Sequence, residues 1–146
     1  PAPASTAPDG FADTLSVTAT GGPVNELPTV ALHQTARGAI LTFNPTALSF
    51  SAGLGQSQQK NFTVNNGGNV SAPYTVAISG GSHPGQFGVA PTSGTASGGG
   101  SVSHTVTFTN PLIGGGNNRT STVALTNSGG TVLCGPLPSA LTLQGN

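Results

Sequence analysis

The chain has 146 residues, which is enough for one domain with a complete hydrophobic core, and its formal net charge at neutral pH is zero. It carries only three Lys or Arg and three Asp or Glu residues, so it offers no basic surface to nucleic acid or an anionic membrane. No stretch approaches the roughly 20 apolar residues of a membrane span. We therefore expect no nucleic-acid partner and no membrane insertion, and the lack of charge repulsion favours self-association.

The composition favours strands and turns over helices. Gly (23 residues) and Pro (12 residues) are frequent, Thr, Ser and Asn are abundant, and the strong helix formers Glu, Lys and Arg are scarce. The single cysteine, Cys134, cannot form an internal disulfide, so it is either a buried small hydrophobe or a thiol available to another chain. No signal peptide opens the sequence; if the protein is exported, its signal has been removed or lies outside these residues.

The N-terminal part of the chain, 1–38, divides into two segments. Residues 1–10 form an extended arm of Pro, Ala, Ser and Thr with nothing to bury. Residues 11–38 are predicted to be a two-strand segment, because apolar and polar residues alternate over 14–18 and again over 30–32, with a Gly-Gly-Pro turn between them.

Residues 39–146 carry closely spaced, short alternating stretches. Strand pieces at 39–43 and 47–50 are interrupted at Asn44–Pro45, a placement tolerated at a sheet edge or where a strand crosses between sheets. Residues 102–108 form the central predicted strand, and 90–100 is predicted to be a Gly/Ser loop. The remaining predicted strands are 60–64, 74–78, 87–89, 120–127 and 141–143. This spacing predicts an all-β fold, an antiparallel β-sandwich of about seven strands.

An internal repeat links the two parts of the chain. Residues 13–32 align with residues 121–143, so that Leu15 meets Val123 and Val17 meets Leu125. The later copy has two extra residues before its Leu-Pro pair, and the final strands need one further residue of shift to superpose their apolar faces. The N-terminal segment therefore resembles the last two strands of a preceding sandwich domain.

A hairpin of this kind exposes an apolar face and open strand edges, which something must cover. Three arrangements are open. The hairpin is a piece of a tandem array, or it docks on another copy by strand complementation, or it packs back on its own domain. In the first two arrangements the proposed interface residues are Leu15, Val17, Val30 and Leu32.

The stretch from Leu41 to Leu143 resembles a known family. It contains LTFNPTALSFSAGLGQSQQKNFTVNNGG, YTVAISG, QFGVAP, GGSVSHTVTFTNP and STVALTNSGG, and is similar to the bacterial choice-of-anchor D type repeat, related to the ASPM/SPD-2/Hydin domain. The resemblance implies an immunoglobulin-like sandwich of seven strands, usually in tandem on secreted surface proteins, without catalytic residues. Many such repeats carry a cysteine pair, but Val102 stands at one of its positions here.

No set of residues predicts an enzyme, a cofactor site or a metal site. His33, His83 and His104 are scattered. His104 shares the inward parity of the central strand, which predicts a core or strand-end histidine with a backbone partner. All three acidic residues lie within 1–38, so no pair of carboxylates converges on a substrate. Three glycosylation sequons occur, at Asn61, Asn69 and Asn118, and Asn118 is the best acceptor because it lies in an exposed loop.

The sequence thus predicts a structural subunit or repeat of an extracellular filament, sheath or surface appendage. Its expected partners are copies of itself or neighbouring repeats of the same chain, and its expected location is the cell surface. The alternative is a glycan-binding or adhesin module of a large tandem-repeat surface protein. The scarcity of aromatic residues argues against that alternative, since the chain has no Trp and one Tyr.

Overall fold

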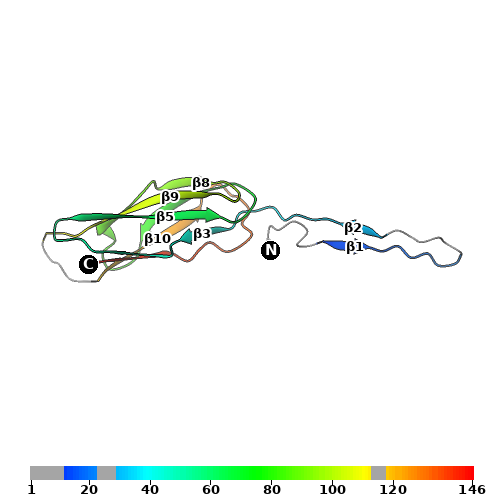
Figure 1. The fold of residues 1–146 in the computed structure, drawn as a ribbon, viewed down its shortest axis with the longest axis horizontal. Coiled ribbons are helices and arrows are strands. Elements are labelled where there is room, and N and C mark those ends of the chain that lie inside the picture. Colours follow the sequence, from blue (N-terminus) through cyan, green and yellow to red (C-terminus); the bar gives the residue numbers. More distant parts are fainter. Residues whose placement is uncertain (1–11, 23–28, 113–117) are drawn as a thin grey trace.

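The computed structural model describes residues 12–22, 29–112 and 118–146. Two β-sheets pack face to face in an elongated body, and a separate two-stranded hairpin extends from one end of it (Figure 1). We call the end of the body that the hairpin's linker enters the proximal end, and the opposite end, where the C-terminus lies, the distal end (Figure 1). No helix in the described parts of the chain has the length and apolar character needed to cross a membrane.

The five-stranded sheet has the order β4-β11-β10-β6-β8, and the four-stranded sheet has the order β3-β5-β9-β7. All pairings in the two sheets are antiparallel except that of β4 with β11, which is parallel. The strands of the body are β3 (Leu41–Asn44), β4 (Ala47–Phe50), β5 (Ser57–Asn66), β6 (Ala72–Ser79), β7 (Phe87–Ala90), β8 (Ser93–Ala96), β9 (Ser101–Thr109), β10 (Arg119–Asn127) and β11 (Leu141–Gly145). One turn of 3-10 helix, Pro84–Gln86, precedes β7.

The core lies between the two sheets because the strands alternate apolar and polar residues. Phe50, Phe87 and Phe108 pack together, with ring centroids 5.0 to 6.0 Å apart. Phe62 packs edge-on against Phe43 on one side and stacks on His104 on the other. Such aromatic contacts add to the stabilisation from buried apolar area.

Two strands cross from one sheet to the other at prolines. The chain leaves the four-stranded sheet after β3 and joins the five-stranded sheet as β4, passing through Asn44–Pro45. It does the same between β7 and β8 through Ala90–Pro91. The crossing at Asn44–Pro45 matches one of the two roles predicted for that proline, and the two predicted strand pieces on either side of it lie in different sheets.

The predicted fold class, an all-β sandwich, is confirmed. The described part of the body has nine strands, two more than the approximate number expected. The prediction of a loop throughout 90–100 is wrong, because Ser93–Ala96 forms β8 and pairs with β6 through Ala72–Thr75. Its side chains are small, so the pairing rests on backbone hydrogen bonds that leave little periodic signal in the sequence.

Candidate assembly site

The N-terminal segment forms a hairpin of β1 (Asp13–Leu15) and β2 (Val30–Leu32). The strands are antiparallel, with Leu15 opposite Val30 and Asp13 opposite Leu32. Since directly opposed residues share a face, these four side chains lie on one face of the hairpin. Val17, two residues beyond Leu15, has the same parity. We call this surface, made of Asp13, Leu15, Val17, Val30 and Leu32, the hairpin face.

The hairpin has the same register as β10 and β11, the last two strands of the body. Each pair of opposed residues in the hairpin has its counterpart in the β10–β11 pairing, in the same order along both strands. The equivalent pairs are Leu15–Val30 and Val123–Leu141, Thr14–Ala31 and Thr122–Thr142, and Asp13–Leu32 and Ser121–Leu143. The internal repeat of the sequence is therefore also a repeat of the pairing pattern.

The two hairpins differ in what covers them. The apolar residues of β10 and β11 that face inward, Val123, Leu125, Leu141 and Leu143, are 0–7% exposed. Their counterparts Leu15, Val17, Val30 and Leu32 are 48–53% exposed. Complete burial of such side chains is worth about 1.5–3 kcal/mol each, so covering the hairpin face would add roughly half of that per residue. The structure places all four predicted interface residues together on an uncovered surface.

The edges of the hairpin are open as well. Within the body, β10 is flanked by β6 and β11 is flanked by β4. In the described part of the chain, β1 and β2 pair with each other and belong to no larger sheet. An isolated two-stranded hairpin is marginally stable in water. The hairpin does not pack on its own body (Figure 1), so the third of the three arrangements is not the one observed.

The linker after the hairpin is held to the body by hydrogen bonds. Asn69 Oδ1 accepts from Gly38 N at 3.1 Å, and Asn69 Nδ2 donates to the Ala36 carbonyl at 2.9 Å. The Ala39 amide donates to Val132 O at 2.9 Å, and the Ala39 carbonyl accepts from Cys134 N at 2.8 Å. We call residues 36–40 the clamped linker, since Ala36, Gly38, Ala39 and Ile40 hold backbone hydrogen bonds to the body.

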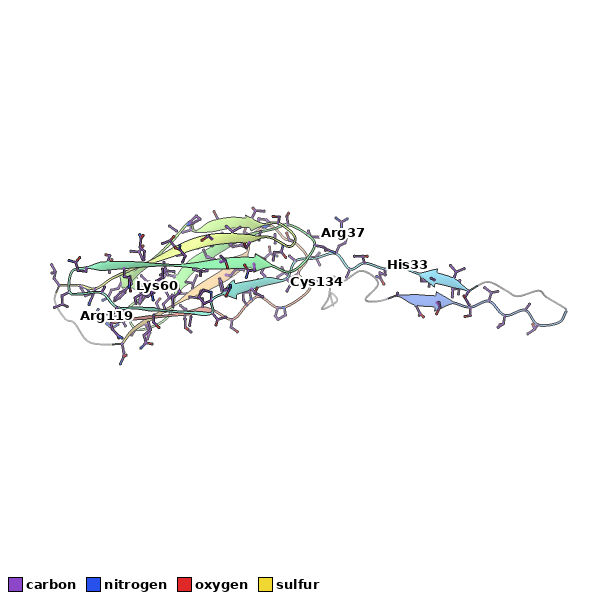
Figure 2. The ribbon with its side chains drawn as sticks, in the orientation of Figure 1. His33, Arg37, Lys60, Arg119 and Cys134 are labelled. Carbon is purple, nitrogen blue, oxygen red and sulfur yellow. The ribbon has the colours of Figure 1, made fainter. Side chains whose placement is uncertain are left out.

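Packing at the clamped linker leaves no space for a larger residue at position 38. A Cβ on Gly38 would lie 2.3 Å from Cys134 Sγ and 2.9 Å from Val132 O. Cys134 is free and buried, and it lies where the linker joins the body (Figure 2). Of the two roles predicted for this cysteine, the buried one is confirmed.

His104 is part of the core. Its Nε2 is 2.7 Å from the Tyr74 hydroxyl, and its Nδ1 is 2.7 Å from the Pro91 carbonyl oxygen. The side chain is buried, which confirms the prediction of a core histidine with a backbone partner. Burial raises the pKa of Tyr74 to about 12. These contacts join the two sheets and use both ring nitrogens, so this histidine is structural.

The other residues singled out by sequence lie apart from one another. His33 lies in the exposed linker, and exposed His83 is 2.8 Å from Ser82 Oγ through its Nδ1. Among the residues that the structure describes, no three His, Cys, Asp or Glu side chains lie close enough to hold a metal ion. Asn118 is exposed, with a φ of 71° and its Oδ1 accepting from Gln144. Its use as a glycosylation site stays a prediction.

A shallow groove of about 270 Å³ lies on the outer face of the five-stranded sheet. Its outward-facing lining consists of small or polar side chains from β4, β10 and β11, without a charged or aromatic residue. The main contributors are Ala47, Ser49, Thr120, Thr122, Thr142 and Gln144. The groove therefore lacks the aromatic platform that a sugar-binding surface would offer.

Comparison with known proteins supports the fold assignment. No protein-family model matches the chain, and no curated protein matches its sequence. Solved structures similar to it include the CupB2 chaperone of Pseudomonas aeruginosa (13% identity, 71% of this chain, 54% of that chain, TM-score 0.54) and the E. coli chaperone DraB (14%, 75%, 55%, TM-score 0.54). A PapD-like domain of human CEP192 is 15% identical over 90% of this chain and 94% of that chain, with a TM-score of 0.50.

At these identities the likeness concerns the fold, and this chain spans about 55% of the length of the two chaperones. The neighbours are immunoglobulin-like, PapD-like sandwiches. The body of this chain has that fold.

Proposed function

We propose that this protein is a structural subunit or repeat of an extracellular filament, sheath or surface appendage. It assembles by docking its N-terminal hairpin on a neighbouring unit of the same kind. That unit is either the preceding repeat of a tandem array, whose last two strands the hairpin supplies, or another copy, to whose open sheet edge the hairpin adds its strands. On this proposal the protein is exported to the cell surface, belongs with the choice-of-anchor D type repeats, and has no catalytic activity.

The observation that carries the proposal is the shared register of the hairpin and the β10–β11 pair. The same residue pattern that is buried in the body stands uncovered in the hairpin, on one face and at both edges. Strand addition supplies main-chain hydrogen bonds to an open edge, and alternate side chains fix the register. A neighbouring sandwich provides both of these and an apolar layer for the hairpin face.

The distribution of charge supports association between unlike surfaces. All three acidic residues, Asp9, Asp13 and Glu26, precede the clamped linker. All three cationic residues, Arg37, Lys60 and Arg119, lie in or after it. The N-terminal part thus carries a charge of −3 and the remainder +3, although the whole chain is neutral. Such complementarity favours head-to-tail contacts over contacts between identical surfaces.

Two adjacent substitutions on opposite faces of β1 test the proposal. Leu15→Asp places a carboxylate on the hairpin face, whereas Thr14→Asp places the same charge on the other face. Sedimentation velocity across a range of protein concentrations should show that Leu15→Asp abolishes self-association and that Thr14→Asp leaves it nearly unchanged. Deletion of residues 11–35, which spares the clamped linker, should abolish association while circular dichroism still reports a folded sandwich. Normal assembly of either the Leu15→Asp or the deleted protein would refute the proposal.

The alternative, a glycan-binding or adhesin module, has less support. Tyr74, the only tyrosine of the chain, is fully buried, and the chain has no tryptophan. A glycan array separates the two functions, since a structural subunit gives no selective signal.

A further inference from the structure

Large exposed apolar side chains gather at particular places along the molecule. Beyond the four on the hairpin, the exposed large hydrophobic residues of the described chain are Leu54, Leu112, Val132 and Leu137. All four lie in loops: Leu54 and Leu112 at the distal end, and Val132 and Leu137 in the connection from β10 to β11, which begins at the proximal end. A single exposed apolar residue is common on protein surfaces, but their gathering in two pairs needs a reason.

Leu54 and Leu112 belong to the distal end. The loop that holds Leu54 is tied to the C-terminus by the Ala52 amide, which donates to Asn146 O at 3.0 Å. The two leucines lie near each other, because a Cβ on Gly55 would be 2.6 Å from Leu112. They are 58% and 75% exposed, respectively.

Val132 belongs to the proximal end, and Leu137 follows it in the same connection between β10 and β11. Val132 O accepts the Ala39 amide of the clamped linker, while its side chain is 60% exposed. This end therefore presents apolar surface next to the point where the hairpin is attached. Neither pair contains a charged residue.

The repeat sets the spacing between successive units. Val30 of β2 corresponds to Leu141 of β11. Asn146 follows Leu141 by the same number of residues as Thr35 follows Val30, so Thr35 is the counterpart of Asn146. The next residue, Ala36, is already buried against the body and holds the first hydrogen bond of the clamped linker. A unit whose last two strands are the hairpin therefore ends where the next body begins, without a free linker between them.

The direction of β2 decides which ends meet. In the body, β11 runs from the proximal end to the distal end, where the C-terminus lies (Figure 1). The equivalent strand β2 runs toward the proximal end of the body that follows it. The distal end of the preceding unit must then face the proximal end of the following one.

We propose that successive units abut end to end, with Leu54 and Leu112 of one copy packed against Val132 of the next. This inference rests on the proposed function, because it takes the hairpin as part of a neighbouring unit. The partner is a second copy of the body, and the contact between the two bodies is small and apolar. Because the chain connects the two bodies, it raises the effective concentration of the two surfaces. The clamped linker fixes their orientation.

A covalent tandem tests the contact without relying on association between separate chains. Residues 1–146 are followed directly by residues 36–146, and Cys134 is replaced by Ala in both bodies. Leu112→Cys in the first body and Val132→Cys in the second should be joined by a short thiol-reactive crosslinker. A matched tandem carries Ala77→Cys, on the outer face of β6, in place of Leu112→Cys. The first tandem should crosslink about tenfold faster than the second, since only its thiols are held together. Equal rates would overturn the inference.

A second measurement uses the tandem without cysteine substitutions in its contact surfaces. Amide hydrogen exchange in residues 53–56 of the first body should slow by about tenfold relative to the single 146-residue chain, at a concentration where that chain is monomeric. Unchanged exchange there would also overturn the end-to-end contact. Failure of the single chain to self-associate would instead count against the proposed function, and the tandem results would still decide the contact between bodies.

Discussion

Replacing Asn66 by Ala should destabilise the sandwich more than any single surface substitution. Asn66 is buried at the proximal end of β5. Its Oδ1 accepts from the amides of Ile40 and Gly68 at 3.1 and 2.9 Å. Its Nδ2 donates to the carbonyls of Val70 and Ala96 at 2.8 and 3.0 Å. One side chain thus satisfies four backbone groups from β8, the turn after β5 and the segment leading into β3.

The expected loss follows from those four contacts. A hydrogen bond contributes about 1 kcal/mol net, and a buried group left without a partner costs about 1–3 kcal/mol. Asn66→Ala removes all four bonds at once, which gives a loss of about 4 kcal/mol if water reaches some of the freed groups. A domain of this size has a free energy of unfolding of about 5–15 kcal/mol, so the variant should remain folded but with a small remaining free energy of unfolding.

Urea unfolding followed by the fluorescence of Tyr74 measures this free energy directly, because the chain has no other tyrosine and no tryptophan. The matched control is Asn65→Ala, a neighbouring substitution of the same type on the outward parity of β5. It should change stability by less than about 0.5 kcal/mol. If Asn66→Ala lost no more than about 1 kcal/mol relative to this control, the four hydrogen bonds would not anchor the proximal end as argued.

Two further predictions concern the core and the clamped linker. Burial raises the pKa of Tyr74 from 10.0 to about 12, so the folded state favours the neutral phenol. This preference contributes about 3 kcal/mol to the free energy of unfolding; the contribution is complete below pH 10 and is lost as the pH rises toward 12. An ultraviolet titration of the native protein with a midpoint near 10 would contradict this. Gly38→Ala brings a methyl group against Cys134 Sγ and should cost about 1–3 kcal/mol. Adding Cys134→Ala should recover part of that loss in thermal unfolding, whereas strictly additive effects would show that the sulfur is not the obstacle.

Periodicity in the sequence predicted most of the sandwich, because its strands bury one face and expose the other. Val106 and Phe108 lie in the core as the pattern of the central strand indicates. The strand Ser93–Ala96 was missed since its small side chains carry no such alternation. Strand β5 begins at Ser57, three residues before the predicted strand 60–64, because Ser57 and Gln59 hydrogen-bond across to Thr109 and Thr107. Pairing with a distant strand extends β5 beyond the residues that alternate in the sequence.

Alternation and the internal repeat led us to propose Leu15 and Leu32 as interface residues, and that role stays a prediction. The structure shows both residues exposed on one face of a hairpin whose pairing register repeats that of β10 and β11. The clamped linker was not predicted. The motif Asn65–Asn69 has the composition of an ordinary turn, and its side chains bond to residues far earlier in the chain. Such long-range partners depend on the assembled fold rather than on local sequence.

The edges of the body explain why association should proceed along the axis rather than sideways. All four edge strands, β3, β4, β7 and β8, have only four residues. Strand β3 pairs only with the end of β5 near Thr63, and the open remainder of β5 carries Lys60 at an inward-facing position, 6.0 Å from the centre of the Phe50 ring. Short edges and an inward-pointing charge both discourage the pairing of sheets from separate molecules. The hairpin, by contrast, is flanked by no other described strand and exposes the apolar residues of the hairpin face. On the proposed function it meets a different surface of the next unit, and such a contact builds a filament where the rotation between units does not close a ring.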